Sequence, residues 1–359
     1  MSTIVLGAGG TGGHLFPAQA LAAELTRRGH TIVVMTDARG TQYPTYFPGA
    51  KIEIVPSATF SGGLSLITAP FKILNGILTG MSKLARIKPA AVVGFGGYPS
   101  LPVMLAAIFS GYPTAILAPD SVLGRANRMV ANSVNAIAGG LPLKRFQPKD
   151  MDKVTYTGNP VRPEVVAMKD APYETPPADG PLNLLVFGGS QGARVLSEMV
   201  PAAVAKLPAA LKSRLSIVQQ CRPEDIEMVR AAYAGVTAEL ASFFGDMPAR
   251  MAKSQLVICR SGVSTVSELA VIGRPAILIP YPFATDDHQT TNALVMVEAG
   301  AAWMIPQSAL TPERLAAQIQ DAFADPAALA KRADAAHAQG KPDAASRFAD
   351  LVEQLGRAE

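Results

Sequence analysis

The chain has 359 residues, of which 49% are hydrophobic and 17% are charged, and its formal net charge is +4. This composition excludes an intrinsically disordered protein and allows two domains with buried cores. The mild positive charge suits an anionic ligand or a phospholipid surface, and the lack of a Lys/Arg run predicts no nucleic-acid partner.

Short apolar segments alternate with longer helical segments from the N-terminus onward. We expect strands at Thr3–Leu6, Thr31–Met35, Ile52–Pro56, Ala91–Gly94, Thr114–Leu117 and Ala136–Ala138. The first intervening segment predicts a helix over Pro17–Arg28 with Gly29 as its C-cap. This alternation is typical of a parallel sheet with helices on both faces.

One stretch, Pro89–Pro119, contains no charged residue and is as long as a membrane span. It is interrupted by the glycine- and proline-containing sequences GFGGYPS and GYP, which a lipid-exposed helix rarely accepts. We therefore expect buried strands and a buried helix here. The apolar run Ile4–Leu6 is too short for a secretory signal, so we expect none.

A proline-rich connector within residues 160–181 predicts a domain boundary. We expect one domain over residues 1–160 and a second over 161–339, with a C-terminal helix at 340–359 packing back on the first. Strands are expected in the second half at Asn183–Phe187, Ser216–Gln219, Leu256–Cys259, Ala276–Pro280 and Ala302–Ile305. The prediction is an α/β protein with two Rossmann-like parallel-sheet domains that face a cleft.

Glycine-rich turns follow the first strand of each half, at Gly7–Gly13 and at Gly188–Gly192. Glycine lets the backbone turn tightly and lets a phosphate approach, and the helix N-terminus that follows attracts anions. Gly7–Gly12 also fits GxGxxG, and Asp37 ends the second strand, so a dinucleotide-dependent oxidoreductase is an alternative. The second glycine turn argues against it, because a single dinucleotide site does not require one.

His14 lies at the end of the first glycine turn, where a helix begins. The positive end of the helix dipole disfavours an imidazolium ion, so we expect a neutral ring that can accept a proton. A neutral histidine beside a glycine turn suits a general base. The alternative is a structural histidine that hydrogen-bonds to nearby backbone.

The second half carries polar residues after two of its expected strands. Ser264 is expected to cap a helix, and Glu268 lies about one turn into it, where its carboxylate could accept from two vicinal hydroxyls or simply face solvent. Asp286, Asp287 and His288 are adjacent and would form a poor chelate. They predict a helix cap and no metal site.

Seven segments resemble the MurG family of bacterial peptidoglycan N-acetylglucosaminyltransferases. They are GGTGGHLFPA (9–18), GFGGYPSLP (94–102), VLGRANR (122–128), TGNPVRPEV (157–165), FGGSQGAR (187–194), SGVSTVSELA (261–270) and DDHQTTNA (286–293). They occur in the family's order and span nearly the whole chain. The resemblance implies the two-domain fold called glycosyltransferase B.

The resemblance also implies two substrates: UDP-GlcNAc as donor, and undecaprenyl-pyrophosphoryl-MurNAc-pentapeptide as acceptor. The implied donor residues are Thr11, Gly12, Gly13, Asp120, Arg162, Ser190, Gln191, Ser264, Glu268, His288 and Gln289. The implied acceptor residues are Gly10, Thr11, Gly12, Gly13, His14, Gly96, Gly97 and Tyr98, with His14 also the catalytic residue.

The implied reaction is an inverting transfer in which the C4 hydroxyl of MurNAc attacks the anomeric carbon and UDP leaves. Neither a metal nor another cofactor is implied, because helix dipoles and turn amides can stabilise the departing diphosphate. The implied location is peripheral, at the cytoplasmic face of the bacterial inner membrane.

The chain departs from the family at Leu117–Asp120, where the family has His-Glu-Gln-Asn. An aspartate accepts hydrogen bonds but does not donate them, and its charge would repel a diphosphate. The departure leaves an alternative open: a relative of the same fold with altered sugar specificity or impaired catalysis.

The segment Leu64–Lys88 combines apolar residues with cations. The apolar residues include Phe71, Leu74 and Leu78, and the cations are Lys72, Lys83, Arg86 and Lys88. Such a patch can lie on an anionic membrane surface, or it can be an ordinary buried helix face. Since the implied acceptor is lipid-linked, we favour membrane contact.

Overall fold

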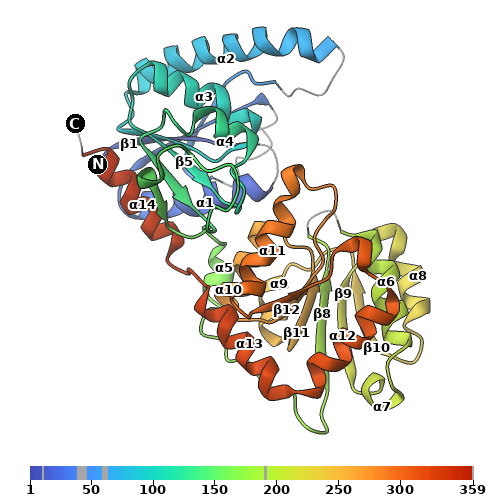
Figure 1. Cartoon of the computed structure of the whole chain (residues 1–359). Helices are drawn as coiled ribbons and strands as arrows, with labels where there is room; N and C mark the ends of the chain where they lie inside the picture. The colour runs from blue at the N-terminus through green and yellow to red at the C-terminus, as the bar shows by residue number, and fades with distance from the viewer. Residues whose placement is uncertain (10–11, 39–46, 59–63, 190–191, 358–359) are drawn as a thin grey trace. The chain divides into compact units, whose positions relative to one another are not determined.

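The computed structural model describes residues 1–9, 12–38, 47–58, 64–189 and 192–357, and the chain divides into two compact units (Figure 1). Unit 1 contains Met1–Arg162 and Lys341–Glu359, and unit 2 contains Pro163–Gly340. Within the described residues, no helix is both long enough and apolar enough to span a bilayer.

Unit 1 is built on a seven-stranded parallel sheet with the strand order β3-β2-β1-β4-β5-β6-β7. Its strands are β1 (Thr3–Gly7), β2 (Thr31–Thr36), β3 (Lys51–Ile54), β4 (Ala91–Gly94), β5 (Thr114–Ala118), β6 (Ala136–Gly139) and β7 (Val154–Tyr156). Its helices are α1 (Gly12–Arg27), α2 (Leu64–Ile87), α3 (Gly97–Phe109), α4 (Arg125–Val130), the 3-10 turn η3 (Met151–Lys153) and α14 (Ala344–Leu355).

Alternate residues of the inner strand β1 pack against different helices of unit 1. Ile4 and Leu6 of β1 belong to one buried cluster, together with residues of α1 and α14. Val5 of the same strand belongs to a second cluster, with residues of α2, α3 and α4. Successive side chains of a strand point to opposite faces, so these helices form two layers that cover the sheet.

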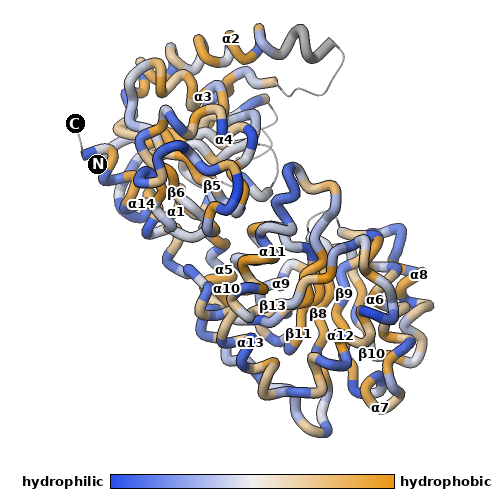
Figure 2. The backbone as a smooth tube through the Cα atoms, viewed as in Figure 1, coloured by the Kyte–Doolittle hydropathy of each residue, from blue (hydrophilic) through white to orange (hydrophobic). Residues whose placement is uncertain are grey.

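Unit 2 is built on a six-stranded parallel sheet with the strand order β10-β9-β8-β11-β12-β13. Its strands are β8 (Leu182–Phe187), β9 (Leu215–Gln220), β10 (Thr237–Ala241), β11 (Leu256–Cys259), β12 (Ala276–Leu278) and β13 (Ala302–Met304). The hydropathy colouring in Figure 2 shows hydrophobic residues along β8 and β11, the two central strands.

The helices of unit 2 are α5 (Pro163–Val166), α6 (Arg194–Ala205), α7 (Ala209–Lys212), η4 (Pro223–Asp225), α8 (Ile226–Ala232), α9 (Met247–Lys253), α10 (Val263–Ile272), η5 (Thr285–Asp287), α11 (His288–Glu298), η6 (Gln307–Ala309), α12 (Pro312–Ala324) and α13 (Pro326–Ala338). Most of them connect the strands, whereas α5 precedes the first strand and η6, α12 and α13 follow the last. Residues of α6, α8, α12 and α13 share one buried cluster with β8 and β9.

Every strand that the sequence predicts is present, although several bounds shift by one or two residues; β3, for example, ends at Ile54 rather than at Pro56. β7 and β10 lie at sheet edges and were not expected, because their burial is incomplete and their apolar signal is weak. β12 ends at Leu278 rather than at Pro280. Helix α1 begins at Gly12 rather than at Pro17, so the end of the glycine turn itself forms the first helical turn.

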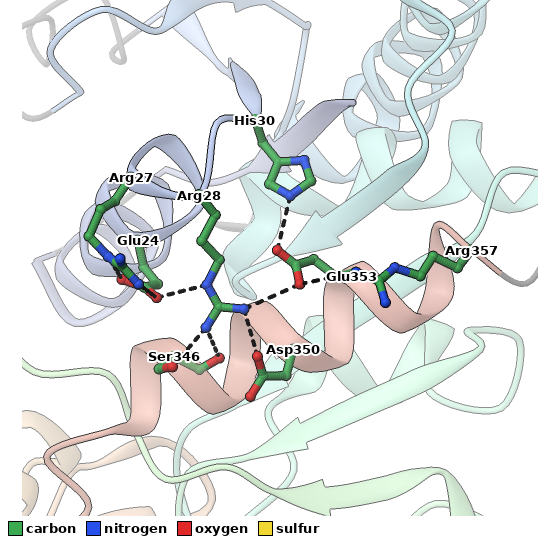
Figure 3. Close-up of polar contacts among 8 residues, drawn as sticks. All are labelled: Glu24, Arg27, Arg28, His30, Ser346, Asp350, Glu353 and Arg357. Atoms are coloured by element: carbon green, nitrogen blue, oxygen red, sulfur yellow. Dashed lines mark hydrogen bonds and ion pairs between the residues drawn. The ribbon is translucent and has the colours of Figure 1, made fainter. Parts of the chain in front are cut away.

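Helix α14 is held against unit 1 by a charged network centred on Arg28, which follows α1 (Figure 3). The Arg28 guanidinium donates to the Ser346 carbonyl oxygen at 2.9 Å and to the Ser346 hydroxyl at 2.7 Å. It also donates to the carboxylates of Asp350 at 2.6 Å, Glu353 at 3.3 Å and Glu24 at 2.8 Å. One side chain therefore ties the last helix of the chain to the first.

Replacing Arg28 with Met should lower the free energy of local unfolding of α14 by about 2 kcal/mol, because several hydrogen bonds between charged groups are lost together. We expect the amide hydrogens of Ala344–Leu355 to exchange about thirtyfold faster, as measured by mass spectrometry. Arg27→Met removes only an exposed contact to Glu24 and should leave this exchange unchanged. Equal exchange in the two variants would contradict the role given to Arg28.

Candidate functional site

In unit 1 the structure brings His14 against the glycines that begin α3. His14 lies in the first turn of α1, after β1, while Gly96 and Gly97 follow β4, the neighbour of β1 in the sheet. The backbone has φ of 78° at Gly96 and 70° at Gly97. A Cβ atom at either position would lie 3.3–3.5 Å from ring atoms of His14. Both the backbone conformation and the packing of the ring therefore favour glycine.

Asn127 joins this cluster, although sequence reasoning gave it no role. Its side chain is 4% exposed, and Nδ2 donates to the Leu117 carbonyl oxygen at 2.7 Å. Its Oδ1 is 3.5 Å from the Cβ position of Gly96. The sequence alone does not mark Asn127, because its burial in α4 and its hydrogen bond to Leu117 depend on the tertiary structure.

The other residues expected in unit 1 are placed as follows. Gly10 and Thr11 lie outside the described residues, whereas Gly12 and Gly13 open α1. Tyr98 is half-buried in α3, and Asp120 is half-buried between β5 and α4. Arg162 ends the unit, with its guanidinium 5.6 Å from the centre of the Phe16 ring.

The segment that departs from the family is mostly sheet core. Leu117 and Ala118 are the last residues of β5, and each is 1% exposed. They pack with the buried clusters on the two faces of the sheet. In this chain the side chains at these two positions are therefore core residues.

Unit 2 contains a pocket of about 660 Å³ at the carboxyl edge of its sheet. The lining residues follow four strands: Gly188 and Gly189 after β8, Arg222 after β9, Arg260 after β11 and Tyr281 after β12. Further lining residues are Gly192, Ala193, Arg194, Val195, Gly262, Thr265, Gln289 and Gln307. The carboxyl edge of a parallel sheet is where such folds bind ligands.

Arg260 is the most deeply buried cation of this pocket, at 9% exposure. Its Nη1 donates to the carbonyl oxygens of Ile279 and Pro280, both at 3.0 Å, and its Nη2 donates to Gln307 Oε1 at 2.7 Å. These acceptors are neutral, and among the described residues no carboxylate forms an ion pair with it. Burial lowers the pKa of Arg260 from its ordinary value, although the group stays protonated.

The other two arginines of the pocket are balanced by acids. Arg194 Nε donates to Glu198 at 2.7 Å, and Arg222 donates to both carboxylate oxygens of Asp225 at 2.8 and 2.9 Å. The net positive charge of the pocket therefore lies on Arg260. Since a buried charge is costly without a counterion, the pocket is suited to bind an anion.

Gln289 lines the pocket, but its carbonyl oxygen is already used. Oε1 accepts from the backbone amides of Ser261 at 3.3 Å and Tyr281 at 3.0 Å. The Ser261 hydroxyl in turn donates to the backbone carbonyl oxygen of Gln289 at 2.8 Å. The side chain is thus held in one orientation, and only its Nε2 group can donate to a ligand.

The remaining expected residues of unit 2 are dispersed. Ser190 and Gln191 lie outside the described residues. Ser264, Glu268 and His288 are near the pocket in sequence but are not among its lining residues. Gly262, not Ser264, is the N-cap of α10, because the chain is already helical at Val263.

Glu268 and His288 occupy defined local positions. Glu268 is 7% exposed within α10, so the alternative of a solvent-facing glutamate is wrong. His288 opens α11, and its Nδ1 lies 2.8 Å from the Thr285 carbonyl oxygen. The preceding Asp287 is the N-cap residue, and its carboxylate accepts from the Thr290 hydroxyl at 2.6 Å. Among the described residues, no three His, Cys, Asp or Glu side chains cluster as metal ligands would.

Comparison with known families matches both halves of the chain. The glycosyltransferase family 28 N-terminal domain matches residues 4–138, and the glycosyltransferase family 28 C-terminal domain matches residues 183–348. Several relatives are named UDP-N-acetylglucosamine--N-acetylmuramyl-(pentapeptide) pyrophosphoryl-undecaprenol N-acetylglucosamine transferase. The one from Paramagnetospirillum magneticum is 49% identical over 97% of this chain and 95% of its own length, and the one from Rhodospirillum centenum is 50% identical over 98% and 94%.

Solved structures agree with this match. MurG from Acinetobacter baumannii has a TM-score of 0.83 at 30% identity and covers 99% of this chain and 100% of its own. A UDP-GlcNAc 2-epimerase from Neisseria meningitidis, solved with UDP-GlcNAc, has a TM-score of 0.66 at 14% identity, with coverage of 99% and 100%. That second likeness concerns the fold alone. These matches give no support to a dinucleotide-dependent oxidoreductase.

Replacing Arg260 with Met should weaken binding of pyrophosphate by about tenfold or more, because a hydrogen bond to a charged group contributes about 1.5–3 kcal/mol. Isothermal titration calorimetry measures this directly. Arg332→Met is the matched control. Arg260 lies 5.4 Å from the centre of the Tyr281 ring and Arg332 lies 4.0 Å from the centre of the Trp303 ring, but Arg332 does not line the pocket. Similar losses in the two variants would show that Arg260 is not the anion-binding group.

Proposed function

The chain belongs to glycosyltransferase family 28, and from this membership we propose that it transfers N-acetylglucosamine from UDP-N-acetylglucosamine to N-acetylmuramyl-(pentapeptide) pyrophosphoryl-undecaprenol in peptidoglycan synthesis. The observation that carries the proposal is the identity of 49–50% with transferases of that name over nearly the whole of both chains. The alternative of a changed sugar or an impaired site at Leu117–Asp120 receives no support from these relatives.

The donor is proposed to bind in the pocket of unit 2. Its diphosphate would lie at the Gly188–Gly192 turn, near the N-terminus of α6, with Arg260 as counterion. The pocket volume of about 660 Å³ lies in the range of nucleotide-sized sites. Gln289 Nε2 would donate to the sugar. His288, the preceding residue of the chain, would lie near the same sugar.

Glu268, Ser264 and Arg162 complete the proposed donor site. Glu268 would accept hydrogen bonds from the ribose hydroxyls, and the backbone around Ser264 would contact the sugar. The position of Glu268 on α10, the helix whose N-cap residue Gly262 lines the pocket, supports this role. Arg162 would contribute a further cation near the diphosphate.

His14 is the proposed catalytic base in unit 1. It would take the proton of the C4 hydroxyl of MurNAc as the C4 oxygen bonds to the anomeric carbon of N-acetylglucosamine. The bond between that carbon and the diphosphate oxygen breaks at the same time, UDP leaves, and the anomeric configuration inverts. The contact of the ring with Gly96 and Gly97 supports this role, because it holds the imidazole in one position, as a general base requires.

Helix α2 is the proposed contact with an anionic membrane surface at the cytoplasmic face of the inner membrane. Phe71, Leu74 and Leu78 are 73%, 54% and 59% exposed, so they are not a buried helix face. Further along α2, Leu84 is 0% exposed and Met81 is partly buried, and both pack with the buried cluster that covers the sheet. Figure 2 shows hydrophobic residues along this helix.

The cations around α2 differ in their availability to a membrane. Lys83 is half-buried and pairs with Glu53, whose pKa is lowered to about 2 by hydrogen bonds from Lys51 and Lys83. Lys72 and Arg86 are exposed. Lys83 therefore serves the fold of unit 1, and the exposed cations would contact lipid head groups.

Transfer of labelled N-acetylglucosamine to a lipid-linked acceptor tests the proposed reaction, and its absence in the wild type would refute the proposal. His14→Ala should lower the rate by about 10²–10⁴-fold, as expected for loss of a general base. Binding of UDP should be unchanged, since the donor pocket lies in unit 2. The control is His337→Ala, because His337 is an exposed histidine of α13 that does not line the unit 2 pocket. Equal loss of UDP binding would make His14 a donor-site residue instead.

The triple variant Phe71→Ser, Leu74→Ser, Leu78→Ser should reduce co-sedimentation with phosphatidylglycerol vesicles by about tenfold or more, because each buried apolar side chain contributes about 1.5–3 kcal/mol. Its melting temperature should equal that of the wild type, since all three side chains are exposed. Met228→Ser, an exposed methionine of unit 2, should leave sedimentation unchanged. Unchanged sedimentation of the triple variant would remove α2 from the membrane contact.

A further inference from the structure

Arg222 lines the unit 2 pocket and packs directly against Gly192, the last glycine of the turn. It follows β9 and lines the same pocket as Gly188, Gly189 and Gly192. Gly192 has a φ of 70°, and a Cβ atom there would lie 2.7 Å from Cγ of Arg222. The hydrocarbon stem of Arg222 therefore packs against the backbone at the end of the turn.

The guanidinium of Arg222 is fixed at its other end. Nε and Nη2 donate to the two carboxylate oxygens of Asp225 at 2.8 and 2.9 Å, a bidentate contact. Nη1 lies 3.1 Å from Glu224. Asp225 is 5% exposed, and the hydrogen bonds from Arg222 lower the pKa of its carboxyl. The side chain is thus anchored to a buried carboxylate at the start of α8.

This anchoring distinguishes Arg222 from Arg260. Two carboxylates already balance the charge of Arg222, so it has little attraction left for a bound anion. Arg260 has only neutral acceptors among the described residues. The contribution of Arg222 is to hold Gly192 in position through the packing of its stem. The Gly192 amide donates to the Gly189 carbonyl oxygen at 3.0 Å across the turn.

We propose that Arg222 is a positioning residue for the diphosphate of the donor, acting through Gly192, and that Asp225 holds it in place. The proposal rests on the proposed function, which puts the diphosphate at this turn. Without the anchored stem, the backbone at Gly192 samples other conformations. The apparent affinity for the diphosphate then falls in proportion to the fraction of molecules in the binding-competent conformation. Contacts to the uridine are unaffected.

Two variants test this by calorimetry and steady-state kinetics. Arg222→Met keeps an unbranched stem and removes the anchor, whereas Asp225→Asn keeps the shape of the anchor and removes its charge. Each should raise the Kd of UDP by about tenfold while the Kd of uridine changes by less than about twofold. The KM for UDP-N-acetylglucosamine should rise similarly, with kcat and the KM for the acceptor unchanged. The double variant should be no worse than either single one, because both act through one contact.

Arg230→Met is the matched control, since Arg230 pairs with Glu227 at 3.6 Å on α8 and does not line the pocket. It should bind both ligands as the wild type does. A wild type that does not bind UDP would refute the proposed function itself. A wild type that binds UDP, with Arg222→Met binding it equally well, would refute only the role of Arg222. Equal loss of uridine and UDP affinity would also refute it, because the whole pocket would then be distorted.

Discussion

A parallel strand delivers its chain to the carboxyl edge of the sheet, where the next helix begins and where there is little room for side chains. Both units meet this constraint with glycine. In unit 1, Gly96 and Gly97 adopt positive φ and leave space that the ring of His14 occupies. In unit 2, Gly192 does the same beside the stem of Arg222. At both edges the glycines therefore allow a functional side chain to pack closely against the backbone.

The arginines of unit 2 show how burial and pairing separate similar residues. Arg194 and Arg222 are bound to carboxylates, whereas Arg260 is buried among carbonyl groups and one amide side chain. A desolvated cation without a nearby acid favours a bound anion, and a paired one mainly fixes local geometry. The same residue type therefore supplies charge at one wall of the pocket and rigidity at another.

Hydrophobic residues at helical spacing are buried in one helix of unit 1 and partly exposed in another. In α14, Phe348, Ala349 and Val352 pack against the sheet of unit 1. In α2, part of the apolar residues do so, while Phe71, Leu74 and Leu78 face outward. A spacing of three or four residues identifies a common helix face, but it does not say whether that face meets protein or another surface.

The sequence by itself determined the α/β class, the positions of most strands and the two glycine turns, because buried parallel strands are short continuous apolar runs and tight turns need glycine. The edge strands β7 and β10 were not predicted, because half-exposed strands lack a continuous apolar run. Only the tertiary structure decided that Leu117 and Ala118 are core, that Asn127 joins His14, and that Arg260 and Arg222 line one pocket. These facts depend on which strands are neighbours in a sheet, and neighbouring strands such as β8 and β11 are joined by contacts between residues far apart in the chain.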